Sequence, residues 1–221
     1  MKTRKTNDLL FEQVARVGKA LASPKRLELL DLLAQGEKPV ETLAGYLAID
    51  IKLASAHLKV LREARLVEAR REGRFIIYRL SGSDVANLWL NLRSVAEKHL
   101  VELQVALELM ASAPERLTTE SRASLLEKAR QGEIIVIDVR PAVEYRAGHL
   151  PSARSMPLSE IERRLAELPA GKEIVAYCRG PFCLMSDEAV RLLRQRGYRA
   201  HKISDGVAEW AAEGLPVEAS A

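Results

Sequence analysis

The apolar residues of this 221-residue chain follow two different spacings, and this change constrains the fold more than any other feature. From Leu9 to Leu66 they recur every three or four residues, as on one face of an α-helix. From residue 134 onward, short apolar runs alternate with helical stretches. The change falls near residues 111–116, where Pro114 cannot continue a helix. The pattern predicts two domains, 1–112 and 121–221, joined by a linker at 113–120.

The composition is that of a globular protein, with 48% hydrophobic and 29% charged residues. No apolar run approaches the ~20 residues of a membrane span, and the basic N-terminus leads into amphipathic sequence rather than the apolar core of a signal peptide. We therefore expect a cytoplasmic protein with no membrane partner. Two cysteines are too few for a disulfide-stapled scaffold or a four-cysteine zinc site, and the closeness of Cys178 to Cys183 favours thiol chemistry in a reducing compartment.

Positive charge is concentrated in the first half of the chain. Residues 1–112 hold 18 Lys and Arg against 14 Asp and Glu, whereas residues 113–221 hold 16 of each. The segment 52–79 alone carries eight basic and three acidic residues. This distribution indicates a polyanionic partner for the N-terminal domain.

Helices followed by a hairpin are expected in the N-terminal domain. One helix begins at Ser23 and Pro24, where the hydroxyl can cap free amides and proline needs no amide, and it ends near Gly36. Shorter helices at 40–47 and 51–64 fit a helix-turn-helix unit. The following run, 67–80, predicts a β-hairpin that turns at Glu72 and Gly73.

The helix at 51–64 has two different faces at about 100° per residue. One side holds Ala54, Leu58, Leu61 and Arg65, and its apolar members are expected to face the core. The opposite side offers cations, a hydroxyl and a small residue, which suits a DNA major groove. Its members are Lys52, Ser55, Ala56, Lys59 and Arg62. His57 lies on the flank, where it either touches a phosphate or is a satisfied structural histidine.

Arg70, Arg71 and Arg74 crowd the tip of the expected hairpin. A helix-turn-helix followed by a basic hairpin is a winged helix, whose wing reaches the phosphate backbone of DNA. The alternative is a solvated charged turn on an unrelated helical domain, and the pattern favours the winged helix.

Two segments of the N-terminal domain resemble ArsR-type winged-helix repressors. Residues 21–30, LASPKRLELL, look like the opening of those proteins, and residues 55–67, SAHLKVLREARLV, resemble their recognition helix and its exit. The resemblance covers roughly residues 8–110, with the motifs in order. It implies a homodimer that binds double-stranded DNA at a palindromic operator and represses transcription until an inducer arrives.

The metal sites of that family are not matched. The helix before the recognition helix, residues 39–47, lacks the cysteine pair that one type of site uses. A second type uses Asp and His ligands on the last helix, where Asp84, His99 and Glu102 occur but Ala86 stands in place of an expected histidine. We expect neither a metal nor another cofactor.

Apolar residues continue at three-and-four spacing along a helix expected at 84–110. The stripe is longer than one small domain needs, so it predicts a dimer seam, which suits two-fold operator binding. Packing against its own domain is the alternative.

Strands and helices alternate in the C-terminal domain, which predicts an α/β fold with a parallel sheet. The expected strands are 134–138, 173–177 and 198–203. The expected helices are 122–130, 158–168, a segment that ends at Gly197, and 207–212.

Cys178 stands directly after a strand and before a helix, at the carboxyl edge where α/β sites lie. Loop amides and the helix N-terminus create positive potential there, which stabilises a thiolate. Arg179 adds a fixed charge, Gly180 lets the backbone curl inward, and Pro181 and Phe182 continue the loop. The alternative is a buried structural cysteine in an ordinary turn.

This half resembles a single rhodanese domain over about residues 120–218. The matching segments are 138–140, 144–153, the loop that begins at Cys178, 206–210 and 214–217. By resemblance, Cys178 is the nucleophile that becomes a persulfide. Asp138 and Arg140 are framework residues by the same resemblance, and Arg146 is a candidate anion contact. The six-residue loop is like that of sulfurtransferases, whereas the related phosphatases have a longer loop.

One departure changes the expected chemistry. Sulfurtransferase loops commonly end in a cation, and Cys183 stands at that position. The lost charge argues against thiosulfate:cyanide turnover, while a second thiol can resolve a persulfide or sulfenate on Cys178 into a disulfide or polysulfide bridge.

The leading hypothesis is a DNA-binding transcriptional regulator, a repressor, whose rhodanese domain senses or transfers sulfane sulfur or oxidant through Cys178, with Cys183 as second thiol. Its small partners are a sulfur donor or an acceptor thiol. One alternative is a sulfurtransferase enzyme with independent DNA binding. Another is an inert domain that binds an oxyanion such as arsenate.

Overall fold

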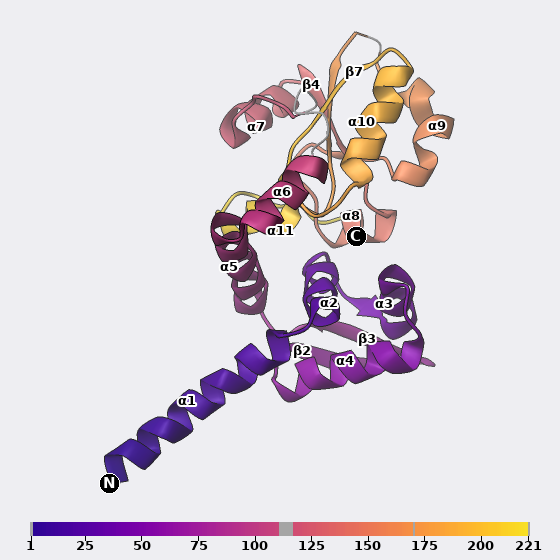
Figure 1. Ribbon diagram of the computed structural model, residues 1–221. Helices are drawn as coiled ribbons and strands as arrows, with labels where there is room; N and C mark the ends of the chain where they lie inside the picture. Colours follow the sequence, from indigo (N-terminus) through magenta and orange to yellow (C-terminus); the bar gives the residue numbers. More distant parts are fainter. Residues whose placement is uncertain (1, 111–116, 170, 221) are drawn as a thin grey trace. The chain divides into compact units, whose positions relative to one another are not determined.

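Residues 2–110, 117–169 and 171–220 are described by the computed structural model, and they fall into two units, Met1–Leu92 and Arg93–Ala221 (Figure 1). The first unit is a winged helix and the second holds a parallel α/β sheet, which confirms the predicted fold class. None of the described helices is long and apolar enough to cross a membrane. Of the linker expected at 113–120, residues 113–116 lie outside the described residues, and Leu117 forms an isolated β-bridge with Lys202.

The first unit contains both the helix-turn-helix and the wing. Its helices are α1 (Lys2–Leu21), α2 (Pro24–Ala34), α3 (Val40–Leu47) and α4 (Ile51–Glu63). Its strands pair antiparallel in the order β1 (Lys38–Pro39), β3 (Phe75–Leu80) and β2 (Val67–Glu72). α1 extends away from the rest of this unit, and its side chains at 6–16 are exposed (Figure 1). The sequence pattern indicates this helix only from Leu9 onward.

The core of the first unit is built from the apolar faces of α2, α3 and α4. Ala54, Leu58 and Leu61 of α4 are fully buried, as their spacing predicts. Asp50 caps this helix, because its carboxylate accepts a hydrogen bond from the Leu53 amide at 2.9 Å. Because the apolar face of α4 is buried, the opposite face of the helix points toward solvent.

Two local expectations are wrong. Arg65 does not share the buried face of α4, because the helix ends at Glu63 and Arg65 lies beyond it, exposed and with φ +59°. Ser23 precedes α2 as expected, but its hydroxyl caps no amide within the described residues. The main-chain carbonyl of Ser23 accepts the first helical hydrogen bonds, from Arg26 and Leu27 at 3.1 Å each.

The wing turns at Gly73 and Arg74, because Glu72 pairs with Phe75 across the hairpin. Gly73 has φ +58°, the left-handed geometry that glycine adopts without strain. The turn therefore lies one residue later than the sequence suggests, and it places Arg74 at the tip.

The helix expected at 84–110 is two helices, α5 (Ser83–His99) and α6 (Val101–Met110). The side-chain amide of Gln104 donates hydrogen bonds to the carbonyls of Glu97 and Lys98 at 2.9 and 3.3 Å, which satisfies acceptors at the end of α5. Apolar periodicity does not reveal such a break.

α5 belongs to both units, since the division falls after Leu92. Val85 and Trp89 are buried in the core of the first unit, so this part of the stripe packs against its own domain. Leu88, Leu92 and Val95 are exposed on the same helix. Part of the apolar stripe on α5 therefore packs into the core of the first unit, and the rest is exposed at the surface.

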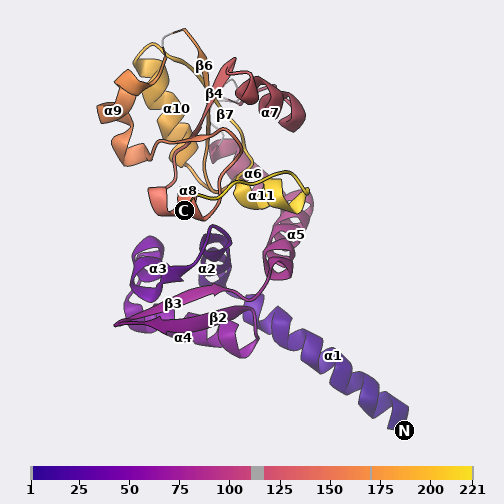
Figure 2. The ribbon, with the colours of Figure 1, turned by 180° about the vertical axis from the view of Figure 1, so that it is seen from behind.

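The second unit is a parallel sheet with helices on both faces (Figure 2). Its strands run in the order β5 (Arg154–Ser155), β4 (Ile134–Asp138), β6 (Glu173–Tyr177) and β7 (Arg199–Lys202). One face packs against α7 (Arg122–Arg130) and α11 (Val207–Ala212). The other packs against α9 (Ile161–Arg164) and α10 (Met185–Gln195). Short 3-10 turns flank α9 where the sequence predicts one helix at 158–168, and α8 (Ala142–Ala147) follows β4.

The strands are apolar on both faces because helices cover both faces. Ile135 and Ile137 of β4 point into the core formed with α10, whereas Ile134 and Val136 point into the core that contains Trp210 of α11. This two-sided burial explains why β4 and β6 occupy the residue ranges predicted from their continuous apolar runs.

Candidate functional site

Cys178 begins the loop that joins β6 to α10, at the carboxyl edge of the sheet. Its side chain is 2% exposed, whereas Cys183 at the far end of the loop is half-buried, and both cysteines are free thiols. The Cys178 sulfur lies 3.3 Å from the Ser186 hydroxyl, at the start of α10, and 3.3 Å from the carbonyl oxygen of Cys183. The loop therefore curls so that its last residue returns to its first. We call residues 178–183 the thiol loop.

The two thiols differ in acidity. A hydrogen bond from the Cys183 thiol is the main cause that lowers the pKa of Cys178 to about 6. Hydrogen bonds from the Ser186 hydroxyl and from the amides of Ser186 and Gly180 act in the same direction, against the effect of burial. The same contact with Cys178, together with burial, raises the pKa of Cys183. The opposite shifts favour the thiolate form of Cys178 and the protonated form of Cys183.

Two glycines allow a close fit between the thiol loop and the start of α11. Gly180 has φ +132°, and a Cβ atom there would lie 2.7 Å from Glu209 Oε1. A Cβ atom on Gly206 would lie 2.5 Å from the carbonyl carbon of Arg179 and 2.8 Å from the carbonyl oxygen of Cys178. The backbone that carries the thiolate is thus held directly against α11.

Arg179 directs its charge to a carboxylate rather than to the sulfur, which corrects the sequence expectation. Its guanidinium forms two hydrogen bonds with Glu144 of α8, from Nε to Oε2 at 2.9 Å and from Nη2 to Oε1 at 2.7 Å. Glu144 is 1% exposed, and a buried carboxylate requires such a partner. Arg179 therefore anchors the thiol loop to α8.

Asp138 and Arg140 form a fully buried ion pair at the end of β4, with Arg140 Nη2 2.5 Å from Asp138 Oδ2. Tyr177 Oη donates to Asp138 Oδ2 at 2.6 Å and accepts from the Leu150 amide at 3.1 Å. Burial disfavours the charged form of Arg140 and is the largest single effect on its pKa. The hydrogen bond to Asp138 and the negative charge of Asp138 act in the opposite direction, and the pKa of Arg140 is raised. Because Tyr177 immediately precedes Cys178, this network fixes the strand end from which the thiol loop starts.

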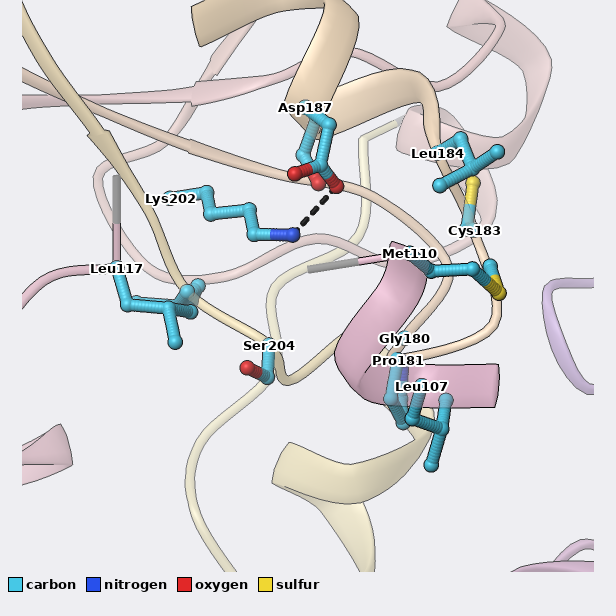
Figure 3. Close-up of a pocket in the computed structure, with 12 residues that line it drawn as sticks. Leu107, Met110, Leu117, Gly180, Pro181, Cys183, Leu184, Asp187, Lys202 and Ser204 are labelled. Atoms are coloured by element: carbon cyan, nitrogen blue, oxygen red, sulfur yellow. Dashed lines mark hydrogen bonds and ion pairs between the residues drawn. The ribbon is translucent and has the colours of Figure 1, made fainter. Parts of the chain in front are cut away.

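A pocket of about 220 Å³ lies beside the thiol loop (Figure 3). Its lining includes Gly180, Pro181 and Cys183 from the thiol loop, Leu107 and Met110 from α6, and the ion pair of Lys202 with Asp187. Within the described chain, neither Cys178 nor Arg146 belongs to this lining. Arg146 is exposed at the end of α8.

Arg93 of α5 contacts both the thiol loop and α11. Its Nη2 atom donates to Glu209 Oε1 at 2.6 Å, and its guanidinium carbon lies 5.5 Å from the centroid of the Phe182 ring. The side chains of Arg93 and Glu209 are only 7% and 11% exposed. Glu209 Oε2 in turn accepts from the Gly206 amide at 2.7 Å. A side chain of α5 is thus connected to the thiol loop through Glu209 and Phe182.

The residues expected to contact DNA lie at the surface of α4 and the wing. Lys52, Lys59 and Arg62 are exposed, and Ser55 and His57 are half-buried. Lys59 Nζ is 3.9 Å from Glu63, a weak surface ion pair. The solvent-facing side of α4 therefore presents the predicted cations.

The three wing arginines differ in their surroundings. Arg74 is exposed at the turn, with its guanidinium carbon 4.9 Å from the Phe75 ring centroid. Arg71 Nε donates to the Gly73 carbonyl at 3.1 Å. Arg70 does not lie at the tip: it forms two hydrogen bonds of 2.7 Å with Glu37, so its charge is already matched.

The described residues contain no cluster of three His, Cys, Asp or Glu side chains arranged as metal ligands. Asp84, His99 and Glu102 are therefore not brought together as one site.

Sequence reasoning missed four residues of the site. Ser186 had a signal, since it lies in the first turn of the helix that follows the thiol loop. Glu144 also had one, because it opens the segment 144–153 that resembles rhodanese domains. Arg93 and Glu209 are 116 positions apart in the sequence and meet only in the folded chain.

Comparisons with known proteins agree with both units. The model of the arsR family of bacterial regulatory proteins matches residues 23–69, and that of the rhodanese-like domain matches residues 121–213. The HTH-type transcriptional regulator Rv0324 of Mycobacterium tuberculosis is 47% identical over 212 residues, which covers 96% of this chain and 93% of that protein. A sulfurtransferase of Allochromatium vinosum is 33% identical over 88 residues, covering 39% of this chain and 80% of that protein.

Two solved structures are similar to separate parts of the chain. The homodimeric winged helix-turn-helix DNA-binding domain of Mb0332 from Mycobacterium bovis is 50% identical, with a TM-score of 0.41, and covers 43% of this chain and 88% of that chain. The Rhodanese_3-like domain of Alr3790 from Anabaena sp. is 30% identical, with a TM-score of 0.37, and covers 40% of this chain and 94% of that chain.

A winged helix joined to a rhodanese-like domain defines a DNA-binding transcriptional regulator with a thiol loop. The chain belongs to the arsR family of bacterial regulatory proteins, as its likeness to an HTH-type regulator over nearly its whole length establishes.

Proposed function

We propose that this protein represses transcription as a homodimer on a palindromic operator, and that it releases DNA when sulfane sulfur or an oxidant reaches Cys178 and Cys183. The return of the thiol loop, which brings Cys183 back to Cys178 with the Cys178 sulfur 3.3 Å from the Cys183 carbonyl oxygen, carries the proposal, and the lowered pKa of Cys178 supports it. A low thiol pKa makes one sulfur reactive at neutral pH, and a second thiol in contact with it makes the modification reversible.

A hydropersulfide, RSSH, supplies the oxidising equivalents for the switch. Its sulfane sulfur is transferred to one thiol of the pair, and the other thiol then displaces it as sulfide. The products are a Cys178–Cys183 disulfide, RSH and hydrogen sulfide. The two thiols lose two electrons, which reduce the sulfane sulfur to sulfide, and two protons, of which RSH and hydrogen sulfide each receive one. Hydrogen peroxide gives the same bridge through a sulfenate on Cys178, with two water molecules as products.

Arg93 links the thiol loop to α5, the helix that continues along the chain into the DNA-binding unit. A bridge between the thiols changes the backbone at 180–182, which packs against Glu209 and Arg93. α5 continues from Arg93 toward the N-terminal side, where Trp89 is buried in the core of the winged helix. A coupling of ~1–3 kcal/mol along this path lowers operator affinity by about 5- to 150-fold.

The DNA-binding surface in this proposal is the exposed side of α4 with the tip of the wing. Lys52, Ser55, Lys59 and Arg62 face the major groove, and Arg71 and Arg74 contact phosphates. His57 and Arg70 contribute less, because His57 is half-buried and Arg70 is paired with Glu37. Exposed apolar side chains on α1 and α5, among them Phe11 and Val95, support the homodimer.

Single-thiol variants test this function. The full-length parent should lose about fivefold or more of its affinity for its own promoter after treatment with a sulfane-sulfur donor. Cys178→Ser and Cys183→Ser should bind that promoter as the reduced parent does and show no loss after treatment. A parent-like response in both variants would refute a thiol switch. The Cys-free double variant serves as the matched control for effects of the donor on DNA binding.

Catalytic sulfur transfer is the second candidate function. Two observations favour it: the amides of Gly180 and Ser186 that bond the Cys178 sulfur, and the similarity of this half to a protein named as a sulfurtransferase. A variant that cannot bind DNA, with Lys59→Ala and Arg74→Ala, should then still pass sulfur from a hydropersulfide to an acceptor thiol. Steady turnover by that variant, with no effect of persulfidation on promoter affinity, would favour the enzyme.

A further inference from the structure

A second pocket lies where β6 and β7 begin, at the opposite edge of the sheet from the thiol loop. Its volume is about 290 Å³. Gly171 and Lys172, which precede β6, line it together with residues 196–199, which lead from the end of α10 into β7. α10 runs along the sheet from one edge to the other, so the thiol loop and this pocket lie at its two ends (Figure 1). We call residues 171, 172 and 196–199 the basic pocket.

The lining of the basic pocket carries three cations, Lys172, Arg196 and Arg199, and within the described residues it holds no carboxylate. Residues 113–221 as a whole contain equal numbers of basic and acidic side chains. Positive charge is therefore gathered locally in one concave place, which raises the concentration of anions there.

Two of these cations are hydrogen-bonded to neutral groups. Lys172 Nζ donates to the carbonyl oxygen of Gly132, and Arg199 Nη2 donates to the carbonyl oxygen of Gly171 at 2.7 Å. A carbonyl group orients a cation without cancelling its charge. Further N–H groups of both side chains stay available, since a lysine has three donors and an arginine five.

Arg196 is the cation of the three that is paired with a carboxylate. Its Nη2 atom lies 2.7 Å from Glu162 Oε1, and the two side chains are 53% and 63% exposed. An ion pair this exposed to solvent is weak. Three positive charges against the one negative charge of Glu162 leave two for a ligand.

We propose that the basic pocket binds a small phosphate monoester through its phosphate group. A phosphate monoester carries about −1.5 to −2 charges at pH 7, which matches the two uncompensated positive charges. Arginine suits this group because its planar fork bonds two phosphate oxygens at once. The volume of about 290 Å³ lies near the lower end of the roughly 300–1,000 Å³ of small-molecule sites, so it leaves room for a small organic group beyond the phosphate.

Side chains, rather than main-chain amides, have to supply the binding energy. The amides at 196–198 donate to carbonyls in the last turn of α10, so they are already used. The carbonyl end of a helix carries about half a negative charge, which the two uncompensated cations outweigh. Tyr198 Oη donates to the Leu165 carbonyl at 2.9 Å and holds the wall between Arg196 and Arg199 in place.

Isothermal titration calorimetry of the full-length reduced protein with glycerol 3-phosphate tests the site, in a buffer without phosphate and at fixed ionic strength. The parent should bind this probe with a Kd of about 1 mM or tighter. Glycerol should not bind, and acetate should bind at least about tenfold more weakly because it carries a single charge. Lack of binding of glycerol 3-phosphate, or an equal affinity for acetate, would overturn the assignment.

Two double variants locate the binding. Lys172→Ala with Arg199→Ala removes both uncompensated charges and should lower the affinity for glycerol 3-phosphate at least about tenfold. Arg163→Ala with Arg191→Ala is the matched control, because it removes two exposed cations of the same unit that lie outside the lining. The control should bind as the parent does. Equal losses in the two double variants would show that net charge, and not the pocket, attracts the anion.

Thermal unfolding without ligand establishes that both double variants are folded. The single variant Arg199→Gln, which keeps the length of the side chain and leaves Lys172 in place, gives a second reading. It should also weaken binding of glycerol 3-phosphate, and a parent-like affinity in this variant would contradict the role of Arg199.

The promoter distinguishes a free phosphate monoester from the other source of phosphate, the DNA backbone. The slope of log promoter affinity against log salt concentration should be the same in Lys172→Ala with Arg199→Ala as in the control variant. A slope lowered by about two would place DNA phosphates in the pocket and overturn its assignment to a monoester. The basic pocket shares no residue with the thiol loop, so this inference and the proposed function fail independently.

Discussion

Replacing Cys183 by alanine should make Cys178 a weaker acid, because the change removes the main hydrogen bond to the thiolate. In the parent the pKa of Cys178 is about 6, so at pH 7 about ten molecules carry the thiolate for each that carries the thiol. A hydrogen bond to a charged group contributes about 1.5–3 kcal/mol, and about 1.4 kcal/mol changes a pKa by one. The pKa of Cys178 in Cys183→Ala should therefore be about 7–8. Ser186 keeps it below the ordinary range.

Ultraviolet absorbance of the thiolate, followed between about pH 4 and pH 9, measures both values. The parent should show one thiolate step in the acidic range, and below that step Cys178 should lose its reactivity. Cys178→Ala is the matched control, which should lose the acidic step and leave Cys183 to titrate above the ordinary thiol range, because burial still raises its pKa. A parent midpoint above about pH 8, or an unchanged midpoint in Cys183→Ala, would refute activation of Cys178 by the Cys183 thiol.

Three further changes test other parts of the account. Arg74→Ala should weaken binding to promoter and random DNA alike, and it should lower the slope of log affinity against log salt concentration by about one. Arg79, a wing arginine held in an ion pair with Glu68, is the control, and Arg79→Ala should change neither. Titrations of DNA affinity at several salt concentrations measure both variants. Gly206→Ala places a Cβ atom 2.5 Å from the carbonyl carbon of Arg179, which should displace the thiol loop and weaken its hydrogen bonds to the Cys178 sulfur. The pKa of Cys178, read from the ultraviolet titration, should therefore rise. Arg93→Ala removes the cation beside buried Glu209, which should lower the free energy of unfolding by about 3–5 kcal/mol in denaturant titrations. The same variant should still gain sulfur by mass while its promoter affinity no longer responds.

The features that sequence predicts well are those set by neighbours along the chain. β4 and β6 match their predicted ranges because a strand buried on both faces must be a continuous apolar run. α3 and α7 match as well, since a short amphipathic helix is marked by its own spacing and by the residues at its ends. The position of Cys178 at a strand end follows from the same local pattern.

The features that escaped prediction depend on contacts between distant segments. The sequence suggested that Arg179 places its positive charge beside the Cys178 thiolate, but the guanidinium pairs with Glu144 of α8 instead. Arg70 looked like a tip residue, but Glu37, 33 positions earlier, pairs with it. Nothing along the chain indicates that Cys178 is covered while Cys183 lines a pocket, because Gly180, Ser186 and α6 decide this only once they are packed. Side-chain partners and burial, rather than the fold, were the unpredictable part.

The central claim is that the state of the Cys178–Cys183 pair sets the affinity for DNA. The most direct test is the fluorescence anisotropy of the protein's own promoter fragment, titrated at one fixed salt concentration with fully reduced protein and with protein treated with a sulfane-sulfur donor. The mass of each sample records the modification. The account predicts a loss of affinity of about fivefold or more that accompanies the thiol modification and is reversed by dithiothreitol. Equal affinities for fully reduced and fully modified protein would contradict it.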